Sequence, residues 1–110
     1  MEKLTELVKE LIKRGVIVSG VGIRNDELCY EINGFAKSGI GTLFIEDGQI
    51  KLETRYQQID TIYSLRDIVG VAYEWDYSYC RKDSIYTVYG VSPAWRKLYE
   101  EFGMDTDDLN

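Results

Sequence analysis

The side-chain inventory of this 110-residue chain leaves few routes to catalysis, because the chain contains no histidine. That absence removes Ser-His-Asp and Cys-His nucleophile systems and every zinc site that uses histidine. The two cysteines, Cys29 and Cys80, are fewer than an all-thiolate zinc site takes. General acid–base chemistry at neutral pH would therefore fall to Asp, Glu, Tyr, Lys or Cys. We expect no catalytic residue, no metal and no cofactor.

Asp76 is the carboxylate that the sequence pattern singles out. In a helix over residues 64–81 it falls inside the apolar arc, between the directions of Leu65 and Val69. A buried carboxylate is costly unless an Arg, a Lys or a Tyr hydroxyl pairs with it, or unless it lies at the edge of the core. We interpret Asp76 as a structural acid. The alternative is a functional carboxylate in an enzyme, because perturbed acids cluster at active sites.

Two glycine-containing segments match phosphate-binding motifs only in part. Residues 20–22 (GVG) follow a hydrophobic stretch, as in a dinucleotide-binding fingerprint, but the third glycine and a following helix are missing. In residues 34–41 a Lys-Ser pair precedes a glycine, whereas a Walker-type loop places its lysine after the last glycine. The alternative function is therefore binding of a small anionic ligand or nucleotide, for which a homodimer is one arrangement. The residues of this alternative site are Lys37, Ser38, Gly39 and Gly41.

Tyrosines give the positive signal in this sequence. Eleven of the fourteen aromatic residues lie between Tyr56 and Phe102, and eight of these are tyrosines. Tyrosine combines a large contact area with a hydroxyl group, which suits it to protein interfaces. On the helical wheel, Tyr77 falls on the polar side of the predicted helix, away from the apolar arc. The predicted partner-binding residues are Asp67, Glu74, Tyr77, Arg81, Tyr86 and Tyr89.

Charge is concentrated at one end of the chain. The net charge is −6, and residues 100–110 contain five acidic residues and neither Lys nor Arg. The other 99 residues hold fourteen acids against thirteen bases, a net charge of −1. The sequence therefore predicts a single domain over residues 1–103 and an acidic C-terminal tail over residues 104–110. An acidic tail attracts a partner with a basic surface. A nearly neutral body does not favour direct nucleic-acid binding, which needs a basic groove.

The segment that must position these residues is 64–81 (SLRDIVGVAYEWDYSYCR), which predicts one continuous helix. Ser64 suits an N-cap, and Asp67 places an acid in the first turn, where the helix dipole favours negative charge. One side of this helix is expected to face the core. Its apolar residues are Leu65, Ile68, Val69, Ala72, Trp75, Tyr79 and Cys80.

The rest of the chain predicts one helix, two hairpins and a last helix. An amphipathic pattern over residues 4–12 precedes Gly15, which is placed to end the first helix. Strands over 16–23 and 28–32 flank a polar turn, and Asp47-Gly48 joins the second strand pair. Residues 57–63 are expected to be a connection, and Ser92-Pro93 opens the last helix. The fold class is therefore α+β: an antiparallel sheet of about four strands, preceded by one helix and followed by two helices packed on it.

Composition bounds the cellular setting and the function. No apolar run approaches the roughly 18 residues of a membrane span, and the N-terminus is not a signal peptide, so we expect no membrane association and a cytoplasmic location. We expect a small, acidic, non-enzymatic protein-binding module. A phage or mobile-element inhibitor or adaptor that acts on a nucleic-acid-binding protein fits this size and acidity, and the order of elements resembles that of some small anti-CRISPR proteins.

Overall fold

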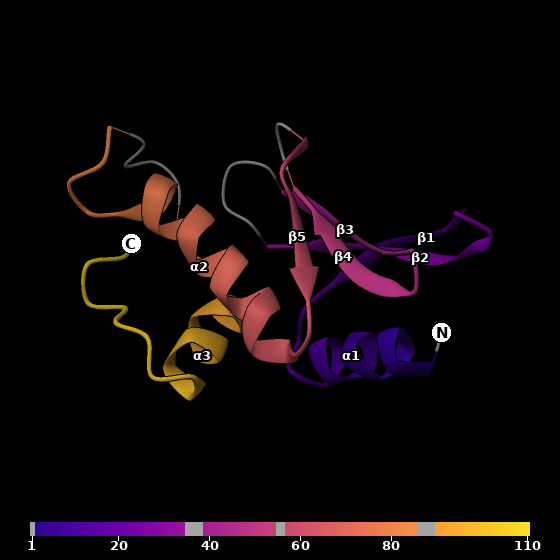
Figure 1. The fold of residues 1–110 in the computed structure, drawn as a ribbon. Coiled ribbons are helices and arrows are strands. Elements are labelled where there is room, and N and C mark those ends of the chain that lie inside the picture. The colour runs from indigo at the N-terminus through magenta and orange to yellow at the C-terminus, as the bar shows by residue number, and fades with distance from the viewer. Residues whose placement is uncertain (1, 35–38, 55–56, 86–89) are drawn as a thin grey trace.

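The computed structural model describes residues 2–34, 39–54, 57–85 and 90–110 (Figure 1). One helix precedes an antiparallel sheet with the strand order β1-β2-β3-β4-β5, and two helices follow it. This confirms the predicted α+β layout, with one strand more than the two hairpins supply. The elements are α1 (Glu2–Lys13), β1 (Val18–Arg24), β2 (Glu27–Asn33), β3 (Ile40–Glu46), β4 (Gln49–Glu53), β5 (Ile59–Ile62), α2 (Leu65–Cys80) and α3 (Pro93–Glu101).

Tight turns set the register of both hairpins. Asn25 and Asp26 have φ angles of 56° and 61°, and Asp47 and Gly48 have φ angles of 52° and 74°. Positive φ at both central residues is the geometry of the two-residue turns that match strand twist, and Asn, Asp and Gly adopt it most readily. The sequence predicted both turns.

The extra strand is β5, which lies within the segment that the sequence analysis treated as a connection. It pairs with β4, and Leu52 lies opposite Asp60. Ile62 is buried, whereas Ile59 at the other end of the strand is exposed. A four-residue strand with one buried apolar residue has too short a pattern to distinguish it from a connection.

The helices cover one face of the sheet (Figure 1). Alternate residues of the central strands point to that face, where α1 packs on β3 and α2 packs on β5. The molecule measures 43 × 27 × 21 Å, and its β1–β2 hairpin extends past the N-terminal end of α1 (Figure 1). The buried sheet residues of this core are Ile32, Leu43, Ile45, Ile50, Leu52 and Ile62.

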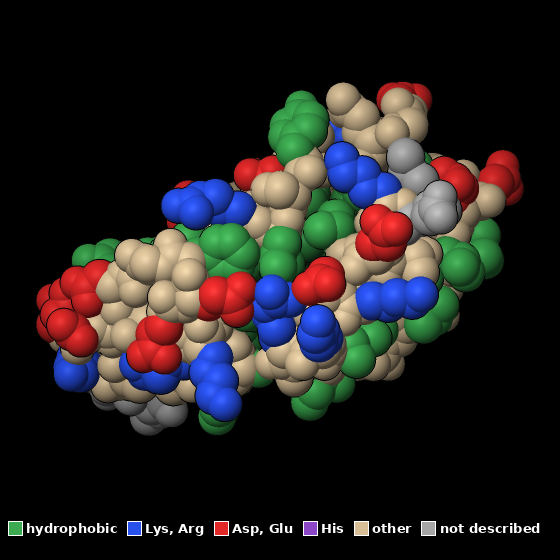
Figure 2. Space-filling view, turned by 90° about the horizontal axis from the view of Figure 1, so that it is seen from below, with side chains coloured by type: hydrophobic (Ala, Val, Ile, Leu, Met, Phe, Trp, Pro, Cys, Tyr) green, Lys and Arg blue, Asp and Glu red, His purple; other side chains and the backbone are tan. Residues whose placement is uncertain are grey.

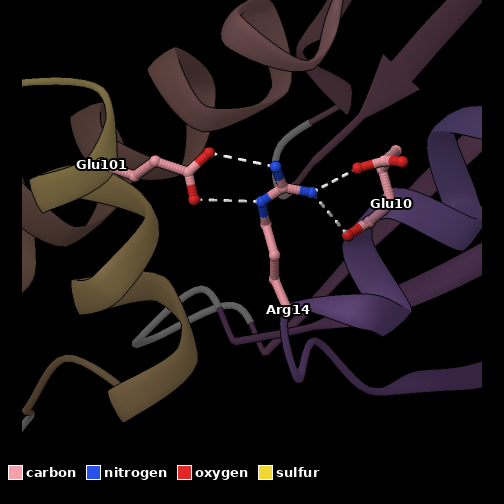
Figure 3. Close-up of polar contacts among 3 residues, drawn as sticks. All are labelled: Glu10, Arg14 and Glu101. Atoms are coloured by element: carbon pink, nitrogen blue, oxygen red, sulfur yellow. Dashed lines mark hydrogen bonds and ion pairs between the residues drawn. The ribbon is translucent and has the colours of Figure 1, made fainter.

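Two contacts fix α3 against the rest of the fold. The indole Nε1 of Trp95 donates a hydrogen bond to the carbonyl oxygen of Asn33 at 2.8 Å. Arg14, just after α1, lies between two carboxylates: Glu101 of α3 accepts from Nε at 3.1 Å and from a terminal nitrogen at 3.0 Å, and Glu10 of α1 accepts from the other nitrogen (Figure 3). Hydrogen bonds from Arg14 lower the pKa of both carboxyl groups.

The acidic C-terminal segment returns to α2. The backbone N–H of Lys82 donates to the Asp108 carbonyl at 2.8 Å, and the N–H of Asn110 donates to the Cys80 carbonyl at 2.8 Å. Leu109 between them is buried. Residues 104–110 are therefore anchored beside the C-terminal end of α2, and their carboxylates have a defined place on the surface.

Candidate protein-binding surface

The first turn of α2 is closed by a side-chain cap. A carboxylate oxygen of Asp67 accepts hydrogen bonds from the backbone N–H groups of Tyr63 at 2.7 Å and Ser64 at 3.2 Å. These bonds satisfy donors that a helix start leaves without intrahelical partners. Asp67 also lies about 15 Å along the helix from Tyr77, given a rise of 1.5 Å per residue. The structure thus gives Asp67 a capping contact and does not bring it together with the other predicted binding residues of α2.

The inner side of α2 forms part of the core, much as the helical wheel predicts. Three members of the predicted apolar arc, Leu65, Trp75 and Tyr79, are only half-buried. The rings of Trp75 and Tyr79 stack on each other with centroids 5.6 Å apart. The fully buried positions include Asp76, whose exposed fraction is 0%. The buried residues of α2 are Ile68, Val69, Val71, Ala72, Asp76 and Cys80.

Asp76 has the tyrosine partner that its predicted position required. The hydroxyl of Tyr99, on α3, donates to Oδ2 of Asp76, and the thiol of Cys80 donates to Oδ1 at 3.9 Å. Burial, followed by the charge of Asp76, raises the pKa of Cys80 to about 12 and the pKa of Tyr99 well above its usual range. Both groups are therefore protonated donors at neutral pH. Asp76, Cys80 and Tyr99 all have an exposed fraction of 0%, which fits a structural acid.

The outer side of α2 places three of the predicted binding residues together. Tyr77 is 38% exposed, and the guanidinium carbon of Arg81 lies 5.1 Å from the centre of its ring. Glu74, one turn earlier, is exposed. Tyr73 stacks on Tyr77 with ring centroids 5.9 Å apart. The side chain of Tyr77 is thus held between an aromatic ring and a cation, and its outer surface remains accessible.

The acidic segment lies against this tyrosine pair. The Tyr73 hydroxyl donates to the carbonyl oxygen of Asp105 at 2.7 Å. Burial raises the pKa of Tyr73, and the charges of Asp105 and Asp108 add to that effect. A hollow of about 240 Å³ joins the two parts of the surface. It is lined by Tyr77, Arg81, Lys82, Asp83 and Asp108.

We call this combined region the tyrosine–acid surface. Sequence reasoning identified Glu74, Tyr77 and Arg81 but did not include Tyr73, although its spacing of four residues from Tyr77 puts the two rings on one side of a helix. It also did not place the acidic residues beside the helix. The tyrosine–acid surface consists of Tyr73, Glu74, Tyr77, Arg81, Lys82, Asp83, Asp105 and Asp108.

Several predicted residues cannot be added to this surface. Tyr86 and Tyr89 lie outside the described residues, as do Lys37 and Ser38 of the alternative ligand site. Gly39 has a φ of 75° and no heavy atom within 4 Å of the position that a Cβ would take. Gly41 is buried within β3, opposite Ile32.

The described residues hold neither a metal-binding cluster nor a membrane-spanning helix. Among the described residues, no group of three or more Cys, Asp or Glu side chains is arranged to hold a metal ion. Within the same residues, every helix is too short or too polar to cross a bilayer. No family model, no curated protein and no solved structure matches the chain.

Proposed function

We propose that this chain is a protein-binding module whose tyrosine–acid surface holds a partner protein through a basic patch. The observation that carries this proposal is the hydrogen bond from the Tyr73 hydroxyl to the Asp105 carbonyl, because it joins the tyrosine pair and the acidic segment into one surface. Aromatic residues commonly supply most of the binding energy of an interface, and surrounding charges set orientation and association rate.

Tyr77 is the proposed anchor of the interface. Its ring is already positioned by Tyr73 and Arg81, so that binding would immobilise few additional bonds. An ordered tyrosine therefore provides contact area at a low entropic cost. Arg81 is engaged by Tyr77 and by the carboxylate of Asp83, whose oxygen lies 3.0 Å from Nε. Four acidic residues of this surface stand against two basic ones, Arg81 and Lys82, so its excess charge is negative.

The charge of the surface supports a partner that itself binds nucleic acid. Such proteins carry clustered Lys and Arg that neutralise phosphates. Asp105 and Asp108 are exposed carboxylates on a segment whose backbone is hydrogen-bonded to α2. Fixed carboxylates of this kind would compete with phosphates for the basic residues of the partner. An inhibitor or adaptor acting on a nucleic-acid-binding protein is therefore the form of the proposal that we favour.

Affinity capture from an extract of the source organism tests this function with matched variants. We expect the wild-type chain to retain a basic protein that Tyr77→Ala and the double change Asp105→Asn/Asp108→Asn each lose by at least about tenfold. High salt should release it, because charge pairs at an interface are screened. Gln49→Ala, at the exposed start of β4, is the control and should retain it. Capture that is unaffected by both surface variants would refute the proposal.

A cavity favours a second candidate, binding of a small anionic molecule. About 400 Å³ lies open between the end of α1 and the start of α3, within the size range of small-molecule sites. Its lining includes the apolar side chains of Val16 and Trp95 and the cationic side chain of Lys97. A thermal-shift screen across nucleotides tests this candidate. It predicts a stabilisation that Lys97→Ala abolishes, and equal melting temperatures with and without every nucleotide would rule these ligands out.

A further inference from the structure

β1 is an edge strand with little protection against pairing in its second half. It has seven residues and pairs only with β2 among the described strands. Residues 15–23 contain no charged residue and no proline. The opposite edge strand, β5, has four residues and carries Asp60. Natural edge strands are commonly shortened or charged because their free N–H and C=O groups pair readily with another strand. β5 follows this rule, whereas the only charged residue of β1 is Arg24 at its end, and its register irregularity is confined to its first half.

The hairpin that contains β1 also exposes apolar side chains. Val21 and Ile23 are 64% and 70% exposed, and Leu28, opposite Ile23 on β2, is exposed as well. Val21 lies opposite Tyr30, which lies opposite the buried Leu43, so these side chains point to the core face of the sheet. They are exposed because the hairpin extends past α1 (Figure 1). We call Val21, Ile23 and Leu28 the hairpin patch.

Much of the surface beyond the hairpin patch is charged. In the view from below, Lys and Arg side chains are interspersed with Asp and Glu, and hydrophobic side chains appear in several places, the right-hand margin among them (Figure 2). Three exposed apolar side chains grouped on one hairpin favour a contact site.

We propose that β1 pairs with β1 of a second copy of this chain, in an antiparallel arrangement that makes one continuous sheet. A two-fold axis perpendicular to the sheet relates two such strands, and it keeps the same face of both copies on the same side. The two hairpin patches therefore lie next to each other. Val21 and Ile23 of one copy become cross-strand neighbours of the same residues in the other, the kind of pair that stabilises sheets.

The apolar residues of the strand favour a second copy as the occupant of this edge, because an antiparallel pair of two β1 strands places Val21 and Ile23 of the two copies beside each other. A chain with a net charge of −6 repels its own copies, and the repulsion is weakest where the contact itself is uncharged. Residues 15–23 carry no charge and provide such a contact. Arg24 and Glu27 lie at the hairpin tip. When two β1 strands pair antiparallel, the tips of the two copies lie at opposite ends of the contact. The register irregularity between Val18 and Gly20 confines the pairing to the second half of β1.

Sedimentation velocity over a dilution series tests this dimer. We expect the wild-type chain to pass from twice the monomer mass to the monomer mass on dilution. Val21→Lys/Ile23→Lys should raise the apparent dissociation constant at least about tenfold, because it places like charges on both sides of the contact. Both side chains are exposed, so the fold should persist, and circular dichroism and thermal melting check this.

Ile59→Lys is the matched control, since Ile59 is an exposed isoleucine (45%) on the other edge strand. It should dimerise like the wild type, and so should Tyr77→Ala, which keeps this test separate from that of the proposed function. A wild-type chain that is monomeric at every concentration would overturn the dimer. So would a folded Val21→Lys/Ile23→Lys variant that dimerises as tightly as the wild type.

Discussion

At the scale of single residues, Asp76 links the two helices that follow the sheet. It lies on α2, and its hydrogen-bond donor Tyr99 lies on α3. A carboxylate at 0% exposure contributes to stability only while its donors remain, because water cannot replace them. This hydrogen bond therefore ties α2 to α3 on the side that faces the core.

Removing the Tyr99 hydroxyl should be costly for this reason. We expect Tyr99→Phe to lower the free energy of unfolding by about 2–4 kcal/mol, since the change removes a hydrogen-bond donor from a fully buried carboxylate. Urea denaturation measures the loss. Tyr73→Phe is the matched control, because the Tyr73 hydroxyl donates to the Asp105 carbonyl at a more exposed position, and it should cost about 1 kcal/mol or less. Equal costs for the two variants would contradict the role assigned to Asp76.

The same cluster predicts a loss of stability in alkali. The pKa of Cys80 is about 12 in the folded chain against an ordinary value of 9.0, so the folded state holds this proton more tightly than the unfolded state. The resulting stabilisation is complete below pH 9 and is lost as the pH rises from 9 toward 12. Unfolding free energies across this range should fall more steeply for the wild type than for Cys80→Ala. Parallel curves would show that the Cys80 thiol is not the titrating group.

At the scale of elements, Gly34 holds the junction between the sheet and α3. Its φ is +123°, and a Cβ built on it would lie 1.8 Å from Nε1 of Trp95. The indole also donates to the Asn33 carbonyl, one residue before Gly34. Glycine is required at this position both for its backbone conformation and for the close approach of the ring.

Gly34→Ala should therefore be severely destabilising, by about 3 kcal/mol or more, because it combines strain with displacement of a buried ring. Thermal and urea unfolding measure the change. Gly48→Ala is the control: Gly48 also has a positive φ, of 74°, but no heavy atom lies near its Cβ position. It should cost about 1 kcal/mol, which is the strain alone. A Gly34→Ala variant as stable as Gly48→Ala would contradict the packing of Trp95.

Local signals explain which elements could be predicted from the sequence. The turn at Asp47-Gly48 and the cap and proline at Ser92-Pro93 each act within a few residues, so the sequence alone identified them. The long apolar pattern of α2 placed even Asp76 correctly. β5 was missed because its pairing with β4, and not its own short pattern, makes it a strand.

At the scale of the whole molecule, contacts distant in sequence build the candidate surface. The helical wheel placed Tyr77 and Arg81 on the outer side of α2. The position of the acidic segment depends on backbone hydrogen bonds from Lys82 and Asn110, which no local pattern encodes. The binding residues of the helix were thus predictable, but their joining to Asp105 and Asp108 was not.

The two proposed contacts use different parts of this molecule. The tyrosine–acid surface lies on α2 and the C-terminal segment, and the hairpin patch lies on β1 and β2 at the far edge of the sheet. A dimer built through β1 would therefore present two tyrosine–acid surfaces. Two such surfaces increase the avidity for a partner that offers two basic patches.

Site-specific photo-cross-linking tests the tyrosine–acid surface most directly. A photoreactive phenylalanine analogue replaces Tyr77 in one sample and Gln49 in another, and both are irradiated in extract of the source organism. We predict that position 77 forms an adduct with a basic protein, and that high salt or Asp105→Asn/Asp108→Asn abolishes the adduct. Position 49 should not form it. The same adducts at both positions, or an adduct at position 77 that is indifferent to salt and to the acidic residues, would contradict the proposal.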